Sequence, residues 1–312
     1  MTRQTPLVSI VIPLYNKADF ILRTVASAAS QLDVAFEIIV VDDGSTDDGA
    51  KLVHNAGLEG LFLIAQENAG VSAARNRGMT AARGKWIAFL DADDVWSCDH
   101  LATLLKAIDG SDAIAAFSNV RLQSHASCPL IHPSLAAQRV ENYFSFALRS
   151  GGYPISSSSI IALKDELVAA GLFAEGISTG EDIDMWCRLA CQGAFFYTAK
   201  LTATYNDARS HTRCSTAGTV VRPFPVRRLH DLIASDELDP RLAESGKRYA
   251  NFLMLEYARQ LLDSGQYGDA RAVLLGECVP RYDPKRFLKR LIRTTSFGQT
   301  LFGLGQTHAR QA

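Results

Sequence analysis

The sequence predicts an α/β protein in which a mostly parallel central sheet is flanked by helices. Short, nearly continuous apolar runs alternate with segments of helical spacing over the first 120 residues, and such runs are typical of strands buried on both faces. Polar clusters follow the first four runs. The content of 47% hydrophobic and 21% charged residues is that of a globular protein with a sizeable core.

Five apolar runs in this first part are expected to be strands. They are residues 7–12, 36–41, 61–65, 85–90 and 112–118. The segments between them have helical spacing, and they are residues 17–31, 46–56, 70–83 and 99–109. Ligands of parallel sheets bind at the carboxyl ends of the strands, so the polar clusters there predict a binding site at that edge.

The rest of the chain is less regular and then becomes helical. Residues 121–155 show no clear pattern. The segments that follow are expected to be a strand, a helix, a helix and a strand, at 156–163, 164–171, 181–193 and 194–205. Beyond residue 215 the spacing is helical, with a Gly/Ser break between two helices. We therefore expect one domain over 1–215 and a helical C-terminal region over 216–312.

Bulk properties argue against several classes of protein. A formal net charge of −1 gives no general attraction to nucleic acid, and no apolar run reaches the roughly 18 residues of a membrane span. The N-terminus lacks the pattern of a signal peptide. Six cysteines without a CxxC pair fit a reducing compartment, so we expect a cytoplasmic protein.

The stretch "FLDADDVW", residues 89–96, places three carboxylates directly after a predicted strand. Asp91, Asp93 and Asp94 repel one another, and no basic residue lies within the stretch. Aspartate is a common residue of turns and helix caps, which is one interpretation. The other is that a divalent cation completes the site.

The stretch "VVDDGSTDD", residues 40–48, ends another predicted strand with two carboxylates. A turn at Gly44 followed by a helix that Ser45 caps would explain the local sequence. Asp42 and Asp43 at the sheet edge could also accept hydrogen bonds from a nucleobase or a ribose hydroxyl.

The loop after the third strand has one glycine and two arginines that could contact a ligand. Gly70 stands where a strand turns into a helix and would allow close approach. Arg75 and Arg77 are either diphosphate ligands or surface charges. The first strand is not followed by G-x-G-x-x-G, so a dinucleotide-binding fold is not predicted.

Five motifs together carry a family resemblance. "VSIVIPLYNK", "EIIVVDDGSTDD", "NAGVSAARNRG", "GKWIAFLDADDVW" and "GEDIDMWCRLA" occur in this order. In order and approximate spacing they resemble the large inverting family-2 glycosyltransferases, which have the GT-A fold and use nucleotide-activated sugars. The resemblance covers residues 6–205 and implies a nucleotide-sugar half over 1–120 and an acceptor half over 121–215.

The resemblance assigns roles at the donor end of the site. Asp91-Ala92-Asp93 matches the family's D-x-D element, which holds a divalent metal against the sugar-nucleotide diphosphate, its first Asp contacting the ribose. Such oxygen ligands suit Mg²⁺ or Mn²⁺, which often share phosphate oxygens with the protein.

Two further loops resemble the parts of the family site that surround the nucleoside. Pro13, Tyr15 and Asn16 match the family's first loop. Asp43, with Asp42 beside it, matches the position that reads the base, and a uracil base is compatible with it.

The motif "STGEDIDMW" resembles the catalytic element of the family. Its acidic residues also suit the positive end of a helix dipole. In similar enzymes the Asp of this E-D pair is the general base, which here is Asp182, with Glu181 as the second candidate. Trp186 lies one turn further on and either stacks on an acceptor sugar or packs in the core. Some relatives supply a late histidine to the metal, and His211 is either such a ligand or a solvated side chain.

Residues 283–295 form a basic amphipathic pattern near the end of the chain. Its apolar residues are expected to share one helical face, namely Phe287, Leu288, Leu291 and Ile292. Its basic residues are Lys285, Arg286, Lys289, Arg290 and Arg293. Such a helix lies on an anionic membrane or docks at the edge of a domain.

The expected function is transfer of one sugar with inversion. The resemblance implies a nucleotide-sugar donor, first of all a UDP-sugar, and a hydroxyl of a glycan or lipid-linked acceptor, in cell-surface or extracellular polysaccharide synthesis. The Q-x-x-R-W signature of processive relatives is absent. A non-catalytic module that binds nucleotide-sugars or glycans is the alternative, because a protein can retain the sequence motifs of a family after it has lost catalytic activity. A phosphatase that uses D-x-D fits poorly, because that element would follow the first strand.

Overall fold

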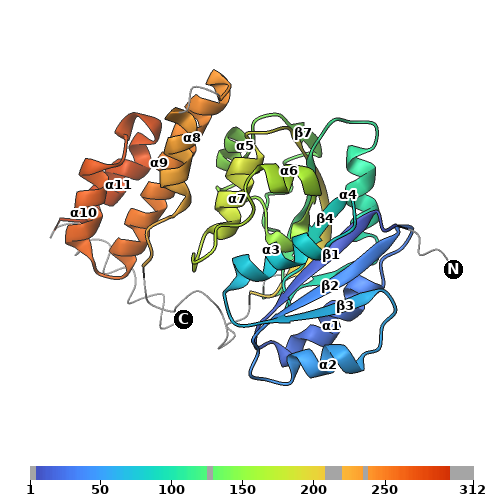
Figure 1. Ribbon diagram of the computed structural model, residues 1–312. Helices are drawn as coiled ribbons and strands as arrows, with labels where there is room; N and C mark the ends of the chain where they lie inside the picture. Colours follow the sequence, from blue (N-terminus) through green and yellow to red (C-terminus); the bar gives the residue numbers. More distant parts are fainter. Residues whose placement is uncertain (1–4, 125–128, 208–219, 235–237, 296–312) are drawn as a thin grey trace. The chain divides into compact units, whose positions relative to one another are not determined.

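The computed structural model describes residues 5–124, 129–207, 220–234 and 238–295 (Figure 1). The contacts within the chain divide it into two compact units, residues 1–214 and 215–312. Each unit is described by itself. No helix of the described residues is both long and apolar enough to cross a membrane.

Unit 1 is built on a nine-stranded sheet in the order β3-β2-β1-β4-β8-β6-β9-β5, with β7 paired to β9. The first four strands run parallel to one another. They are β1 (Val8–Leu14), β2 (Phe36–Asp43), β3 (Leu61–Gln66) and β4 (Trp86–Phe89). The predicted strands therefore form the expected parallel half of the sheet.

The second half of the sheet is mixed. Its strands are β5 (Val95–Trp96), β6 (Ala115–Leu122), β7 (Gln138–Val140), β8 (Ile160–Leu163) and β9 (Phe195–Tyr205). Strand β8 is antiparallel to both β4 and β6, whereas β6 and β9 are parallel. The predicted fold class is confirmed, and its parallel pairings lie within β1–β4 and between β6 and β9.

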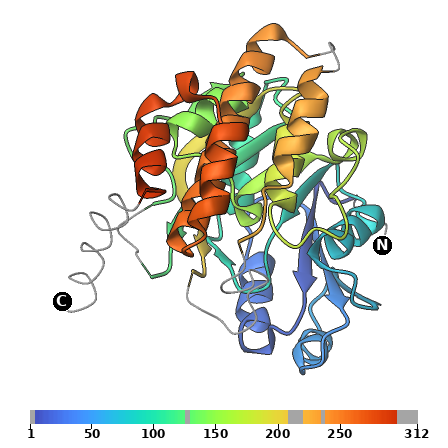
Figure 2. The same cartoon turned by 90° about the vertical axis from the view of Figure 1, so that its left-hand side faces the viewer.

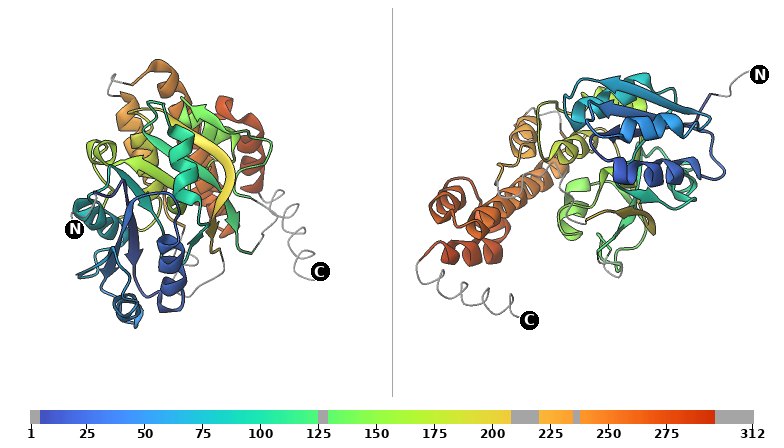
Figure 3. Two further views of the ribbon diagram at one scale, coloured as in Figure 1. Left: turned by 90° about the vertical axis from the view of Figure 1, so that its right-hand side faces the viewer. Right: turned by 90° about the horizontal axis from the view of Figure 1, so that it is seen from below.

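Helices cover both faces of this sheet. In unit 1 they are α1 (Ala18–Ala29), α2 (Gly49–Asn55), α3 (Val71–Ala81), α4 (His100–Ile108), α5 (Tyr143–Arg149), the short η1 (Ser157–Ser159), α6 (Lys164–Ala169) and α7 (Glu181–Leu189). Helices α1 and α2 lie on one side of β1–β3 and α3 on the other (Figure 1), and α4 lies against β9 (Figure 3, left). Strand β7 and helix α5 fall within residues 121–155, so the expectation of irregular structure there was wrong for these two segments.

The secondary-structure elements in the described residues of unit 2 are all helices. They are α8 (Pro225–Ala234), α9 (Pro240–Asp263), α10 (Tyr267–Gly276), the short η2 (Pro280–Tyr282) and α11 (Pro284–Arg293). The 24-residue helix α9 contacts α8, α10 and α11, as Figure 2 shows for the orange and red helices. The predicted break between two helices is found at Ser264 and Gly265.

The side chains of β1 point alternately to the two faces of the sheet, and both faces are buried. Ile10 and Ile12 belong to a buried cluster with Ile21 and Val25 of α1. The intervening Val11 faces α3, where Gly78 lies against it. Because side chains of a strand alternate between faces, a strand buried on both sides must be apolar at nearly every position, which the sequence of β1 shows.

Replacement of Gly78 by alanine should destabilise unit 1. A Cβ there would lie 2.4 Å from Cγ1 of Val11, so α3 must shift away from β1. Overpacking of this kind costs about 1–3 kcal/mol. Urea unfolding followed by tryptophan fluorescence measures it, because Trp86, Trp96 and Trp186 all lie in unit 1.

The matched control is Gly268→Ala in α10, where a Cβ would meet no atom within 4 Å. Glycine disfavours a helix by about 0.5–1 kcal/mol relative to alanine, so this variant should be slightly more stable by circular dichroism. Equal stability of Gly78→Ala and the parent protein would show that α3 is not packed against β1 as described.

Candidate active site

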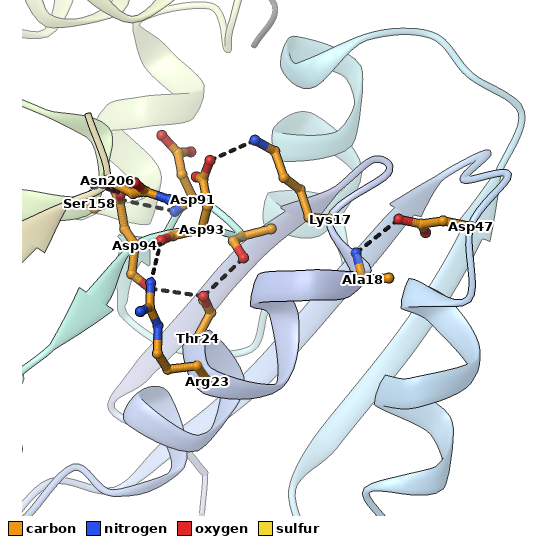
Figure 4. A network of polar contacts seen from close by, with 11 residues as sticks. Lys17, Ala18, Arg23, Thr24, Asp47, Asp91, Asp93, Asp94, Ser158 and Asn206 are labelled. Atoms are coloured by element: carbon orange, nitrogen blue, oxygen red, sulfur yellow. Dashed lines mark hydrogen bonds and ion pairs between the residues drawn. The ribbon is translucent and has the colours of Figure 1, made fainter. Parts of the chain in front are cut away.

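Four loops meet at the carboxyl edge of the parallel strands. They follow β1, β2, β3 and β4, and the register of the strands brings Leu14 beside Asp42, and Asp43 beside Gln66. Figure 4 shows how the loop after β4 lies against the start of α1 and the ends of β9 and η1. The predicted polar clusters are thus gathered at one edge.

Asp93 is paired with a basic side chain from the first loop. Nζ of Lys17 lies 2.6 Å from Oδ2 of Asp93, and these side chains are only 13% and 19% exposed (Figure 4). Arg23 donates a longer hydrogen bond to the backbone carbonyl of Asp93. A lysine at the start of α1 therefore compensates part of the negative charge that the sequence placed after β4.

Asp91 is paired with a buried arginine that also contacts α7. Nη2 of Arg75 lies 2.9 Å from Oδ1 of Asp91, and Nη1 lies 3.0 Å from Oε1 of Glu181. The guanidinium is 4% exposed and stands over the ring of Phe173. Burial alone would lower the pKa of Arg75, but the charges of Asp91 and Glu181 raise it above its usual value. Arg75 therefore stays charged and joins the loop after β4 to the start of α7.

Asp94 differs from the other two aspartates because it is fully buried. Oγ of Ser158 donates a 2.5 Å hydrogen bond to its Oδ2, and the backbone N–H of Asn206 donates to its Oδ1 at 2.8 Å. Burial, and then the negative charges of Asp91 and Asp93, raise the pKa of Asp94 well above its usual value. Its side chain anchors the loop after β4 to η1 and to the end of β9.

The remaining two aspartates fit a divalent cation shared with a substrate. Asp91 and Asp93 are partly exposed and offer hard carboxylate oxygens. No group of three His, Cys, Asp or Glu side chains in the described part of the chain could hold a metal ion alone. Mg²⁺ and Mn²⁺ commonly use one or two carboxylates and take their other ligands from water and phosphate oxygens. These two carboxylates thus suit a cation that binds together with a diphosphate.

Asp182 lies in the first turn of α7, next to the residue that binds Arg75. The turn begins after Gly180, whose φ of 82° is left-handed. Burial, and then the charge of Glu181, raise the pKa of Asp182 to about 7, while Arg75 opposes this effect. Asp182 keeps a partly exposed surface. A carboxylate with this pKa can accept a proton near neutral pH.

The first loop is held to the second by Asn16. Its Oδ1 accepts hydrogen bonds from the backbone N–H groups of Thr46 and Asp47, and its own N–H donates to Oγ of Ser45. Ser45 therefore does not cap α2, which begins later, at Gly49. Asn16 ties two loops together, and the neighbouring Tyr15 is 41% exposed and free to meet a ligand.

The carboxylates of Asp43 and Asp42 accept hydrogen bonds from other groups of the protein. Oδ1 of Asp43 accepts from Gln66 and from the backbone of Ala69, and Oδ2 accepts from the N–H of Gly70. Asp42 accepts from the backbone of Ser45. Asp43 thus shapes the loop that leads into α3, where the φ of 91° at Gly70 requires glycine. Contact of Asp43 with a base stays a prediction.

Other expected site residues lie elsewhere or have another role. Trp186 is fully buried and packs against Phe89 and Phe173, so it belongs to the core and does not face an acceptor. Pro13 and Ala92 are buried in the backbone framework of the site. His211 lies outside the described residues, so its role as a metal ligand stays a prediction.

Sequence reasoning missed Lys17 and Ser158 as parts of the site. Lys17 is the one basic residue of the loop after β1. Ser158 lies in a run of four serines, and nothing in the sequence distinguishes it from the other three. Both pair with residues of the loop after β4 that are distant in sequence. The need for countercharge near three carboxylates was the only hint of Lys17.

Comparison with known proteins relates one part of the chain to a known family. Residues 9–157 match the family model described as glycosyl transferase family 2. This match covers slightly less than half of the 312-residue chain. The chain is 40% identical over 122 residues to the succinoglycan biosynthesis protein ExoO of Rhizobium meliloti, which covers 39% of this chain and 35% of that protein. It spans about a third of the length of several curated relatives that it matches.

Solved glycosyltransferase structures confirm the predicted GT-A fold. The structure of S. aureus TarS 1–349 in complex with UDP-GlcNAc has a TM-score of 0.71, with 18% identity over 96% of this chain and 92% of that one. The mannosyltransferase PcManGT from Pyrobaculum calidifontis, in complex with GDP-Man and Mn²⁺, has a TM-score of 0.59, with 19% identity over 95% of this chain and 88% of that one. At these identities the likeness concerns the fold.

Replacement of Arg75 by alanine should strongly destabilise unit 1. The change leaves Asp91 and Glu181 facing each other without their shared countercharge. Breaking a buried ion pair from one side costs about 3–5 kcal/mol. Urea unfolding followed by tryptophan fluorescence gives the difference.

Arg77→Ala on the same helix is the matched control, because Arg77 is exposed and has no ion pair within the described residues. Its effect should stay within about 0.5 kcal/mol. If Arg75→Ala kept the stability of the parent protein and lost only nucleotide affinity, Arg75 would be a diphosphate ligand instead of a link between two elements.

Proposed function

We propose that this protein is a family-2 glycosyltransferase that moves one sugar, with inversion, from a nucleoside-diphosphate sugar to an acceptor hydroxyl in a metal-dependent reaction. One observation carries the proposal. Arg75 joins Asp91, at the donor end, to the start of α7, where Asp182 has a pKa of about 7. A diphosphate-binding end and a basic carboxylate are thereby held at a fixed spacing.

At the donor end, Asp91 and Asp93 would hold the divalent cation, which when bound supplies positive charge against the leaving diphosphate. Lys17, beside Asp93, adds a second positive group at the same place. Tyr15 is exposed at the first loop and is available to the nucleoside. Preorganised charge of this kind is commonly the largest contribution to catalysis of group transfer.

At the acceptor end, Asp182 removes the proton of the attacking hydroxyl. The new C–O bond forms at the anomeric carbon on the side opposite the diphosphate, and the old C–O bond breaks with its electron pair going to the diphosphate. The configuration therefore inverts. A positioned base contributes about 10²–10⁴-fold to the rate. Glu181 is paired with Arg75 and is therefore less available for this role.

The substrate class is proposed from the relatives. TarS has been solved with UDP-GlcNAc and PcManGT with GDP-Man, so a UDP-sugar is our first choice and a GDP-sugar the second. A relative named for succinoglycan biosynthesis supports a role in polysaccharide synthesis. A glycan or lipid-linked acceptor and a cytoplasmic location are part of our proposal. We assign residues 1–120 to the donor and 121–215 to the acceptor. A module that only binds nucleotide-sugars or glycans is the alternative.

Two substitutions separate donor binding from transfer. The donor nucleotide is chosen by a thermal-shift panel of UDP, dTDP and GDP with and without Mn²⁺. Asp93→Ala should lower the affinity of the protein for this nucleotide in the presence of Mn²⁺ by at least about 10–100-fold, because loss of even an outer-shell partner of a metal has an effect of this size. Asp182→Asn should keep this affinity and lower turnover by about 10²–10⁴-fold, because the base is lost. Calorimetry measures binding, and release of nucleoside diphosphate from the sugar donor measures turnover.

Asp19→Ala, an exposed carboxylate at the start of α1, controls for the change of charge and should alter neither quantity. Unchanged Mn²⁺-dependent affinity in Asp93→Ala would contradict the metal site. Tight nucleotide binding without turnover in the parent protein, across a broad panel of donors and acceptors, would support the binding module.

The pH profile tests the base independently. A base acts when deprotonated, so kcat/KM should rise with pH and level off above a midpoint near 7, the pKa of Asp182. Glu181→Gln should move this midpoint to lower pH, because the charge of Glu181 raises the pKa of Asp182. Turnover of the donor over pH 5–9 (roughly the range in which carboxylates of this kind titrate) gives both midpoints.

Glu175→Gln is the control, since Glu175 bonds to Asn76 and is not among the main groups that shift Asp182. Its midpoint should equal that of the parent protein. Complete loss of turnover in Glu181→Gln at every pH would instead make Glu181 the base.

A further inference from the structure

Helix α11 does not bury the apolar face that its sequence predicts. Phe287 and Leu291 are partly buried, whereas Leu288 is 57% exposed and Ile292 is 37% exposed. The four apolar residues lie on one side of the helix, as predicted from their spacing, but they are not buried together. The helix turns so that Arg290, not an apolar residue, is its most buried side chain.

The exposed side of the helix combines apolar and basic residues. Lys285, Leu288, Lys289 and Ile292 are spaced i, i+3, i+4 and i+7, so they form one stripe along the helix. All four are exposed. We call this stripe the α11 outer face.

The basic residues of α11 divide into two groups. Two arginines form ion pairs within unit 2: Arg290 with Glu256 at 2.5 Å and Arg293 with Asp263 at 2.7 Å. The lysines Lys285 and Lys289 have no carboxylate within ion-pair distance in the described residues. The uncompensated positive charge of the helix is thus on the same side as its exposed leucine and isoleucine.

The two units of the chain carry opposite net charge. Residues 215–312 contain fifteen lysines and arginines against ten aspartates and glutamates, whereas residues 1–214 contain seventeen against twenty-three. The whole chain is almost neutral only because these charges cancel. Such an asymmetry is typical of a protein in which one part meets an anionic partner.

We propose that the α11 outer face binds an anionic lipid bilayer, with the helix lying in the plane of the membrane surface. Lysines attract the anionic headgroups, and the two apolar side chains between them enter the boundary of the acyl chains. A soluble polyanion such as RNA or an acidic glycan would be bound by charge alone and gives no reason to expose Leu288 and Ile292. The contact is peripheral, because α11 has ten residues and a span needs about twenty.

Vesicle flotation of the full-length protein without donor tests this proposal. The parent protein should float with vesicles that contain equal parts of phosphatidylcholine and phosphatidylglycerol and not with vesicles of phosphatidylcholine alone. Lys285→Glu with Lys289→Glu should lower the partition coefficient more than about tenfold, because each lysine near an anionic surface contributes substantially to binding. Leu288→Asn with Ile292→Asn should lower it also, although this pair leaves the charge unchanged.

The control is Arg227→Glu with Lys247→Glu, which makes the same change of charge on exposed positions of α8 and α9. It should keep the binding of the parent protein, and circular dichroism should show all variants folded. The proposal is overturned if the parent protein does not float with anionic vesicles, or if both charge-reversed variants lose binding equally. It is also overturned if the asparagine pair floats like the parent protein, or if the protein binds RNA or heparin and not vesicles. None of these outcomes depends on the proposed transferase activity.

Discussion

The buried guanidinium of Arg75 is the constraint on which the site depends. It holds one carboxylate from the loop after β4 and one from the start of α7, and these are separated by about ninety residues of chain. A charge with so little exposure is tolerated only where both partners are present, so the two loops cannot move apart without a large cost. The separation of Asp91 from the start of α7, where Asp182 lies, is therefore limited by an ion-pair network within the protein.

The three aspartates after β4 differ in their burial and in their hydrogen-bond and ion-pair partners, and therefore in their roles. Asp94 is enclosed by Ser158 and the backbone of Asn206 and fixes the loop. Asp91 and Asp93 each face a basic side chain and keep some exposure. Burial and the charges of its neighbours raise the pKa of Asp94, which favours its neutral form, while Arg75 and Lys17 compensate the charges of Asp91 and Asp93.

The sequence predicted the fold class and the edge of the sheet where the site lies, because strand and helix periods are local properties. It did not predict the inward role of Arg75, which depends on Glu181 at a separation of 106 residues, or the anchoring roles of Asp43 and Asp94. The same limit explains α11. A helical period shows which residues share a face, but only the packing of unit 2 decides that Leu288 points outward while Arg290 points inward.

Charge is the reason why we propose a cation at this site in addition to its basic groups. Unit 1 has an excess of acidic residues, and the proposed donor, a nucleoside-diphosphate sugar, is itself an anion, so long-range electrostatics would oppose its binding. Coulomb repulsion is strong at short range between partly desolvated groups, and Asp91 and Asp93 lie where we propose that the diphosphate binds. Arg75 is already committed to Asp91 and Glu181, which leaves Lys17 as the basic side chain beside Asp93. One ammonium cannot balance two carboxylates and a diphosphate, and the divalent cation that we propose at Asp91 and Asp93 would supply the missing positive charge.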